Sequence, residues 1–253
     1  MPNRYKQVFL DLIERKKAQG YVFFAKQEEH GFAYLICNID YEILQCAIDL
    51  ATEKSRYTMD QDQANRLRNE YVKIKKCAQG VLAEMFIHIL LTERYGLDVL
   101  RFDLERDTFE YTPAEYDIKI IIGSNEFEVE SRSSSVHYYD VGRFINEDVI
   151  IGPYGNRVKI MDEFADFHFR PIYVPEFRPF AFGENGMPCL NEEMVNGEIK
   201  LIITGVATKK EFLEYGYTGS LGQRGTKYHL LDVMVAGDVS TMDNKFFNLK
   251  NRF

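Results

Sequence analysis

The chain has no tryptophan and only four cysteines among its 253 residues. The cysteines lie far apart in the sequence, with no Cys-x-x-Cys spacing and no histidine near them at the spacing of a zinc site. This distribution excludes a zinc finger and a dense disulfide framework. It predicts reduced thiols and a cytoplasmic protein.

Long hydrophobic runs are missing as well. No apolar stretch approaches the roughly 18 residues that a membrane-spanning helix requires, and the N-terminus leads into an amphipathic segment rather than a secretory signal. Internal repeats, low-complexity segments and proline-rich linkers are also absent. An apolar content of 45% predicts a packed globular core instead. We expect a mixed N-terminal lobe over residues 1–76 and a core over residues 77–253, or a single domain, since no clean boundary is visible.

Positive charge is scarce, because 39 acidic residues outnumber 31 basic ones and the net charge is −8. A protein that coats nucleic acid without specificity needs a basic surface, so this class is disfavoured. One local run of basic residues extends from Lys54 to Lys76. It is typical of a solvated helix face or of a surface that contacts phosphates, and Lys73 and Lys76 are its candidates for nucleic-acid binding.

Hydrophobic spacing and local end signals predict a mixture of helices and strands. Helices are expected over residues 5–17, 41–52, 60–76, 79–91, 139–146 and 208–216. Strands are expected over residues 21–25, 32–37, 99–103, 118–122, 167–174 and 199–206, with residues 177–189 as an irregular loop. Asp40 is a plausible N-cap, Thr208 and Glu211 form a capping box, and two prolines favour an edge position for the strand at 167–174.

The stretch of residues 117–132 contains the largest group of candidate catalytic residues. The apolar strand 118–122 is followed by a turn at Gly123 and by a second strand in which Phe127 and Val129 alternate with acids. Successive strand residues point to opposite faces, so one face collects Asp117, Lys119, Glu128, Glu130 and Arg132. Two carboxylates about 4 Å apart repel by about 4 kcal/mol at an effective dielectric near 20. The cluster therefore predicts a divalent cation with oxygen ligands, and a solvated acidic face is the alternative.

A resemblance to a known family joins this hairpin to an upstream helix. Gly80-x-x-Ala83-Glu84 on an apolar helix, the strand 99–103, Asp117, and Glu128-x-Glu130 together resemble the PD-(D/E)xK nuclease superfamily. The resemblance implies an α/β restriction-endonuclease-like fold, with a mixed central sheet flanked by helices.

The resemblance also implies site residues. Asp117, the bridging aspartate, and Glu128, the acid of the strand motif, would hold the metal ion. Glu84 would be the acid of the first helix, and would either act from behind these ligands or bind a second metal ion. The Val129 carbonyl would be a third ligand to Mg²⁺, for which Mn²⁺ would substitute. Glu130 stands where the family has lysine, and would hold a second ion or orient the attacking water. Tyr116 stands where the family has proline.

Two cations are candidates for the role of the missing lysine. Arg132 and Lys119 lie on the same expected face as the acids. Either would complete the catalytic site, or both would only neutralise the acidic cluster.

Further candidates for nucleic-acid contact lie outside the hairpin. They are Ser133, Ser134, Ser135 and His137 after the second strand, and Gln223, Arg224 and Lys227 in a glycine-rich loop. The alternatives are a turn for the serines and a flexible connector for the loop. The loop lacks the spacing of a P-loop, so no nucleotide cofactor is expected.

The sequence therefore predicts a magnesium-dependent endonuclease that cleaves double-stranded DNA, as a site-specific restriction endonuclease does. A homodimer is expected by analogy alone. An RNA endonuclease of the same fold, and an inactive nuclease fold that serves as a DNA-binding or assembly module, remain alternatives.

Overall fold

The computed structural model describes residues 4–57, 69–105, 117–136, 141–155, 163–182, 188–221 and 226–252. Its helices are α1 (Arg4–Ala18), α2 (Tyr41–Ser55), α3 (Glu70–Ile89), the π-helix η1 (Leu90–Arg94), α4 (Phe102–Glu105), α5 (Val141–Glu147), α6 (Glu192–Val195), α7 (Lys209–Tyr215), α8 (Val233–Ala236) and α9 (Val239–Lys250). None of the described helices is long and apolar enough to span a membrane.

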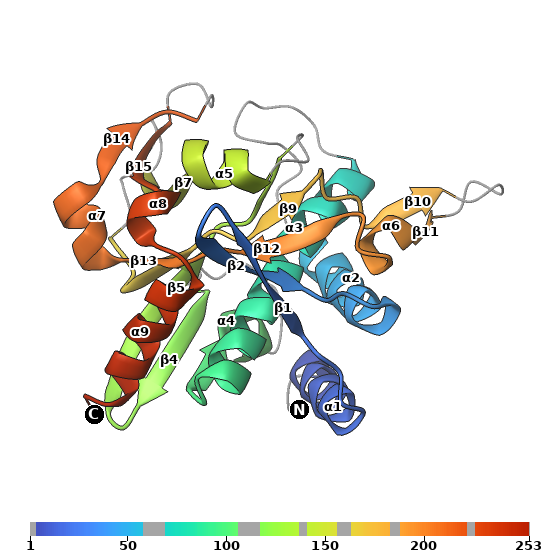
Figure 1. Cartoon of the computed structure of the whole chain (residues 1–253). Helices are drawn as coiled ribbons and strands as arrows, with labels where there is room; N and C mark the ends of the chain where they lie inside the picture. Colours follow the sequence, from blue (N-terminus) through green and yellow to red (C-terminus); the bar gives the residue numbers. More distant parts are fainter. Residues whose placement is uncertain are drawn as a thin grey trace.

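The strands form two large sheets, a smaller sheet and a hairpin (Figure 1). One five-stranded sheet has the order β1 (Phe24–Glu29), β2 (Phe32–Cys37), β12 (Lys200–Ile203), β9 (Ile172–Val174), β6 (Ser134–Ser135). The other has the order β13 (Val206–Thr208), β8 (Phe167–Phe169), β5 (Asn125–Ser131), β4 (Ile118–Ile122), β3 (Asp98–Arg101). The smaller sheet contains β14 (Tyr217–Gly219), β15 (Lys227–Asp232) and β7 (Val149–Gly155), and the hairpin contains β10 (Phe180–Phe182) and β11 (Pro188–Leu190). The expected mixed α/β class is confirmed.

Three chain segments run through both large sheets. β5 pairs with β8 in parallel, and their continuations β6 and β9 pair in parallel as well. Between them the ladder continues, because the Arg132 N–H donates to the Phe169 carbonyl and the Ser134 N–H donates to the Pro171 carbonyl. β12 and β13 follow the same course antiparallel to β9 and β8. The two sheets are therefore halves of one bent surface.

The structure corrects four predictions in this part of the chain. The expected strands 167–174 and 199–206 are each divided in two, and the expected loop 177–189 contains the hairpin β10–β11. Pro171 lies at one bend, where it has no N–H to donate to a ladder. At the other bend Gly205 is required, since a Cβ there would lie 1.9 Å from the Gly237 carbonyl oxygen. The expected edge position is also wrong, because β8 lies between β13 and β5, and β9 between β12 and β6.

Local signals place several element ends correctly. The Asp40 side chain accepts a hydrogen bond from the Ile43 N–H at the start of α2, and Thr208 and Glu211 form the expected capping box of α7. The first strand, however, begins at Phe24 and runs on to Glu29, because His30 and Gly31 adopt positive φ and make a tight turn. Of the helix expected over residues 60–76, the part before Asn69 lies outside the described residues.

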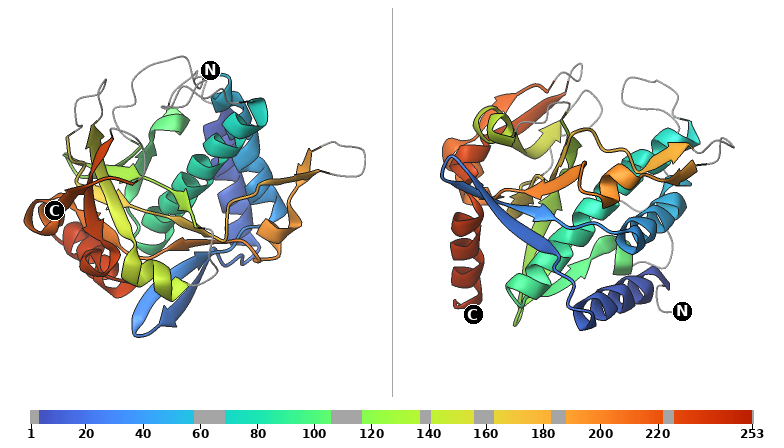
Figure 2. Two further views of the ribbon diagram at one scale, coloured as in Figure 1. Left: turned by 90° about the horizontal axis from the view of Figure 1, so that it is seen from above. Right: turned by 45° about the vertical axis from the view of Figure 1, so that its right-hand side comes forward.

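α3 passes through the centre of the molecule. Its residues from Ala78 to Ile89 are almost all buried, and the helix continues through Gly80 without interruption. A helix that is apolar on all sides must be surrounded by other elements. Helices α1, α2 and α3 lie side by side in both views of Figure 2. The N-terminal strand β2 pairs with β12 of the C-terminal half, so that both expected parts of the chain contribute to one sheet.

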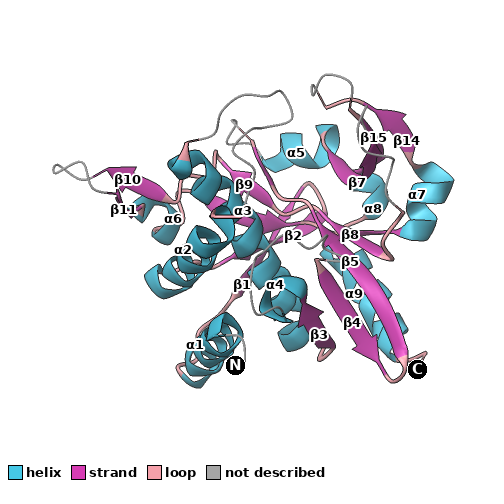
Figure 3. Cartoon of the chain, turned by 180° about the vertical axis from the view of Figure 1, so that it is seen from behind, coloured by secondary structure: helices cyan, strands magenta, loops and turns pink. Residues whose placement is uncertain are grey.

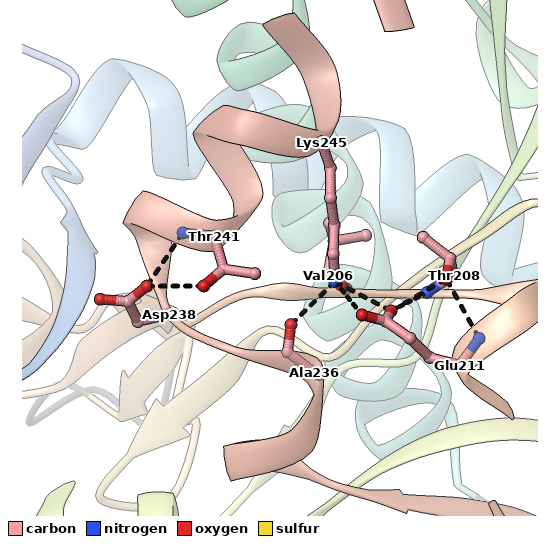
Figure 4. Close-up of polar contacts among 7 residues, drawn as sticks. All are labelled: Val206, Thr208, Glu211, Ala236, Asp238, Thr241 and Lys245. Carbon is pink, nitrogen blue, oxygen red and sulfur yellow. Dashed lines mark hydrogen bonds and ion pairs between the residues drawn. The ribbon is translucent and has the colours of Figure 1, made fainter. Parts of the chain in front are cut away.

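The C-terminal helix α9 packs against β8, and Figure 3 shows it behind the β4–β5 hairpin. Phe246 contacts Phe167 and Phe169, with ring centroids 5.1 Å and 6.1 Å apart. Lys245 ties the helix to the sheet through bonds from its Nζ to the carbonyls of Val206 (2.6 Å) and Ala236 (2.9 Å) and to the carboxylate of Glu211 (2.8 Å) (Figure 4).

Candidate functional site

The register of the β4–β5 hairpin decides which acids face each other. Ile118 pairs with Val129 and Lys119 pairs with Glu128. One step further along the antiparallel register, Asp117 lies opposite Glu130. The Ser131 N–H donates to Asp117 Oδ2 at 2.8 Å, which holds this carboxylate at the end of β5.

Glu128 does not occupy the position that the sequence predicts for it. It is an exposed residue opposite Lys119, and Lys119 Nζ lies 2.9 Å from Glu126 Oε2. The acid beside Asp117 is Glu130 instead. Alternation along a strand identifies the face of a residue but not its partner, which depends here on the two-residue turn at Gly123 and Ser124. Val129 faces the hydrophobic core, so only its backbone could take part in a site.

Glu84 lies on α3, which packs against β5 of this hairpin. Its side chain is nearly buried, and the charges of Asp103 and Asp117 act on it. Burial raises the pKa of the Glu84 carboxyl, and these two charges raise it further, although Lys54 and Arg101 oppose them. Helix and hairpin therefore bring together two of the predicted acids, Glu84 and Asp117.

Asp117 has a raised pKa for related reasons. Burial is the main cause and the charge of Glu130 is the next, while the Ser131 N–H, Lys54 and Arg132 act in the opposite direction. A site that disfavours the ionised form of two carboxyls favours any cation that can enter it.

Two further residues of the cluster were not predicted as site residues. Lys54 Nζ lies 2.6 Å from Asp103 Oδ2, and Asp103 follows β3 in the short helix α4. Burial lowers the pKa of Lys54, but the charges of Glu84, Asp103 and Asp117 outweigh burial and raise it. In the sequence Lys54 belongs to a basic run and Asp103 to the end of a strand. Only the packing of α2 against α3 and the ion pair between α2 and α4 reveal them.

The two expected replacements for the motif lysine lie at different places. Arg132 Nη2 is 2.6 Å from Glu130 Oε1, and its guanidinium lies 4.8 Å from the ring centroid of Tyr154. Lys119 bonds with Glu126 nearer the hairpin turn. Arg132 is thus the candidate that contacts an acid of the cluster.

A polar cleft begins beside these acids. It has a volume of about 520 Å³ and is lined by residues of α3, of the segment after β5 and of three other segments: Lys75, Lys76, Gln79, Gly80, Ser131, Arg132, Ser133, Ser134, Ser135, Ile151, Glu176 and Tyr228. Lys75 pairs with Glu176 at 2.8 Å. Two of the serine hydroxyls form hydrogen bonds within the protein. Ser133 donates to the Gln79 carbonyl, and Ser134 accepts from Arg170.

The predicted nucleic-acid contacts are only partly gathered in this cleft. Lys76 and the three serines line it, whereas Lys73 is not among the lining residues. Lys227 is exposed at the start of β15, next to the cleft residue Tyr228. His137, Gln223 and Arg224 lie outside the described residues.

The donor set suits a magnesium ion in one respect. Within the described ranges, no three carboxylate, imidazole or thiolate groups lie close enough to hold a single ion. Mg²⁺ usually keeps several waters, however, and binds through one or two carboxylates together with substrate phosphates. Asp117, directly before β4, and Glu130 of the neighbouring strand β5 lie beside a polar cleft and supply two such carboxylates.

No family model, no curated protein and no solved structure matches this chain.

Proposed function

We propose that this chain is a magnesium-dependent endonuclease that hydrolyses phosphodiester bonds in DNA, in the manner of a site-specific restriction endonuclease of the PD-(D/E)xK type. One observation carries the proposal. Asp117, directly before β4, lies opposite Glu130 of β5. The charge of Asp117 acts on Glu84 of α3, and a cleft that contains Lys75, Lys76 and Arg132 begins beside these acids.

The electrostatics of the acidic cluster favour a bound cation. Burial and neighbouring acids raise the pKa of Glu84 and of Asp117, although Lys54 opposes this shift at both carboxyls and Arg132 opposes it at Asp117. Asp117 and Glu130 would hold Mg²⁺, and Glu84 would act from behind them. Bound there, the ion would lower the pKa of a coordinated water and neutralise charge on the scissile phosphate.

The cleft supports a polyanionic substrate. Lys75, Lys76 and Arg132 line it, while the protein as a whole is acidic. Phosphate contacts depend on local basic groups, so one basic cleft on an acidic protein directs the nucleic acid to one place. The choice of DNA, the duplex site and the dimer come from the family resemblance.

The test is incubation of the purified protein with plasmid DNA, phage DNA and single-stranded RNA, each with Mg²⁺ and with EDTA. Discrete DNA fragments that require Mg²⁺ support a site-specific enzyme, whereas a smear indicates a non-specific nuclease. Cleavage of RNA alone favours the RNA endonuclease. Cleavage that persists in EDTA contradicts the proposed metal dependence.

A catalytically inactive module is a second candidate, and specific contacts favour it. Lys54 bonds with Asp103 and Arg132 bonds with Glu130, so protein cations already neutralise part of the cluster. Such a protein would bind DNA, cleave nothing and show no stabilisation by Mg²⁺ or Ca²⁺.

A further inference from the structure

Lys54 is a cation in the acid cluster that comes from outside the hairpin. It lies in the last turn of α2, with its Nζ 2.6 Å from Asp103 Oδ2. The charges of Glu84 and Asp117 also act on it. An ammonium group is therefore close to the carboxylates of Glu84 on α3 and of Asp117 directly before β4.

Lys54 is more exposed than Asp103, the residue with which it forms an ion pair. The Lys54 side chain is 34% exposed and the Asp103 side chain only 6%. Asp103 thus holds the ammonium from the protein side, while part of the Lys54 side chain remains exposed. An ammonium has three donor hydrogens on a flexible stem, so a bond to Asp103 is compatible with a second bond to an incoming phosphate oxygen.

The other cations near the cluster have different surroundings. Arg101 is fully buried, and Lys119 bonds with Glu126 nearer the hairpin turn. Arg132 bonds with Glu130 and lies over Tyr154. Of these four cations, Lys54 is the one on which the charges of both Glu84 and Asp117 act and whose side chain is also partly exposed.

We propose that Lys54 supplies from α2 the catalytic cation that the hairpin lacks. In this role, which rests on the proposed function, its ammonium bonds to a non-bridging oxygen of the scissile phosphate and stabilises the negative charge that grows there during hydrolysis. Asp103 is a positioning residue that fixes the ammonium. Lys54 keeps its proton throughout and forms no covalent bond with the substrate.

The test compares Lys54→Met and Lys54→Arg with Lys17→Met. Lys17 is a suitable control because it is similarly exposed, at 39%, and pairs with Glu14 and Glu93 on another surface. Single-turnover cleavage is measured in Mg²⁺, and DNA affinity is measured in Ca²⁺. We expect Lys54→Met to slow cleavage about 100- to 1,000-fold, as loss of one charge-stabilising donor does, with DNA affinity changed less than about threefold.

Lys54→Arg separates catalysis from structure. Arginine keeps the charge and the ion pair with Asp103, so the melting temperature should stay within about 2 °C, but its planar fork does not replace a compact ammonium. Cleavage should therefore fall at least tenfold in a folded protein. If Lys54→Met fails to fold, this variant carries the test.

A third measurement does not depend on activity. Removal of a positive charge beside Glu84 and Asp117 should tighten Ca²⁺ binding at least threefold in Lys54→Met, by calorimetry without DNA, and leave it unchanged in Lys17→Met. Wild-type cleavage rates in both Lys54 variants would overturn this role and leave the proposed function intact. A wild-type protein that cleaves no nucleic acid overturns the proposed function, and the role of Lys54 with it.

Discussion

Asp117 and Glu130 face each other across the hairpin, whereas Glu128 faces Lys119. We expect Asp117→Asn to reduce DNA cleavage at least about a thousandfold, equivalent to about 4 kcal/mol of transition-state stabilisation. Glu128→Gln should cleave at close to the wild-type rate. Single-turnover cleavage in Mg²⁺ measures both.

Asp117→Asn should also affect the thermal stability of the protein. Asparagine keeps an oxygen that can accept the hydrogen bond from the Ser131 N–H, and it removes the repulsion with Glu130. In metal-free buffer the melting temperature of Asp117→Asn should equal or exceed that of the wild type. Normal cleavage by Asp117→Asn, or loss of cleavage only in Glu128→Gln, would show that the register does not define the site.

The buried His168 should make the protein less stable at acidic pH. It is 1% exposed, and burial, together with the charge of Arg132, lowers its pKa to about 3. In the unfolded chain the His168 imidazole takes up a proton near pH 6.5, whereas in the folded protein it stays neutral down to about pH 3. The free energy of unfolding is therefore highest above pH 6.5 and decreases as the pH falls toward 3. At pH 5 the loss is about 2 kcal/mol.

Urea unfolding of the wild type and of His168→Leu at pH 7.5 and pH 5.0 measures this contribution. The free energy of unfolding should fall by about 2 kcal/mol less in the variant between the two pH values. Equal pH dependence in the two proteins would mean that His168 titrates normally in the folded state.

At the scale of elements, Lys245 joins α9 to β13 and α7. Its Nζ donates to the carbonyls of Val206 and Ala236 and contacts Glu211 (Figure 4). Lys245→Met leaves these groups without their donor in a mostly buried place, and we expect the free energy of unfolding to fall by about 3 kcal/mol. Lys210→Met, at an 80% exposed lysine of α7, should change it by less than about 0.5 kcal/mol.

Urea unfolding at pH 7.5 measures both lysine variants. A loss below about 1 kcal/mol in Lys245→Met would show that the contacts of its ammonium contribute little beyond the packing of Phe246 on the sheet.

The elements that the sequence predicts well are those with local causes. Asp40 and Thr208 cap their helices with bonds that lie within three residues of the cap. The division of the strand at residues 199–206 could not be predicted in this way. It depends on the close approach of Gly205 to Gly237, the residue at the end of α8.

For the whole molecule, the proposed metal binding would depend on α3, the hairpin and α2 together. A ligand at 100 times its dissociation constant stabilises a folded protein by about 2.7 kcal/mol, which is about 5 to 10 °C in a chain of this size. We expect this rise in melting temperature with Ca²⁺ or Mg²⁺ for the wild type, and almost none for Asp117→Asn. An equal rise in both proteins would place the ion elsewhere.

The sequence by itself determined the mixed class of the protein, the capped helices, the face on which the acids of the hairpin lie, and Glu84 in an apolar helix. These follow from period, polarity and contacts within a few residues. Only the tertiary structure decided that Glu130 faces Asp117, that two sheets form one bent surface, and that Lys54 joins the acids. Strand register and the packing of distant helices are set by contacts between residues far apart in the chain, and no local pattern encodes them.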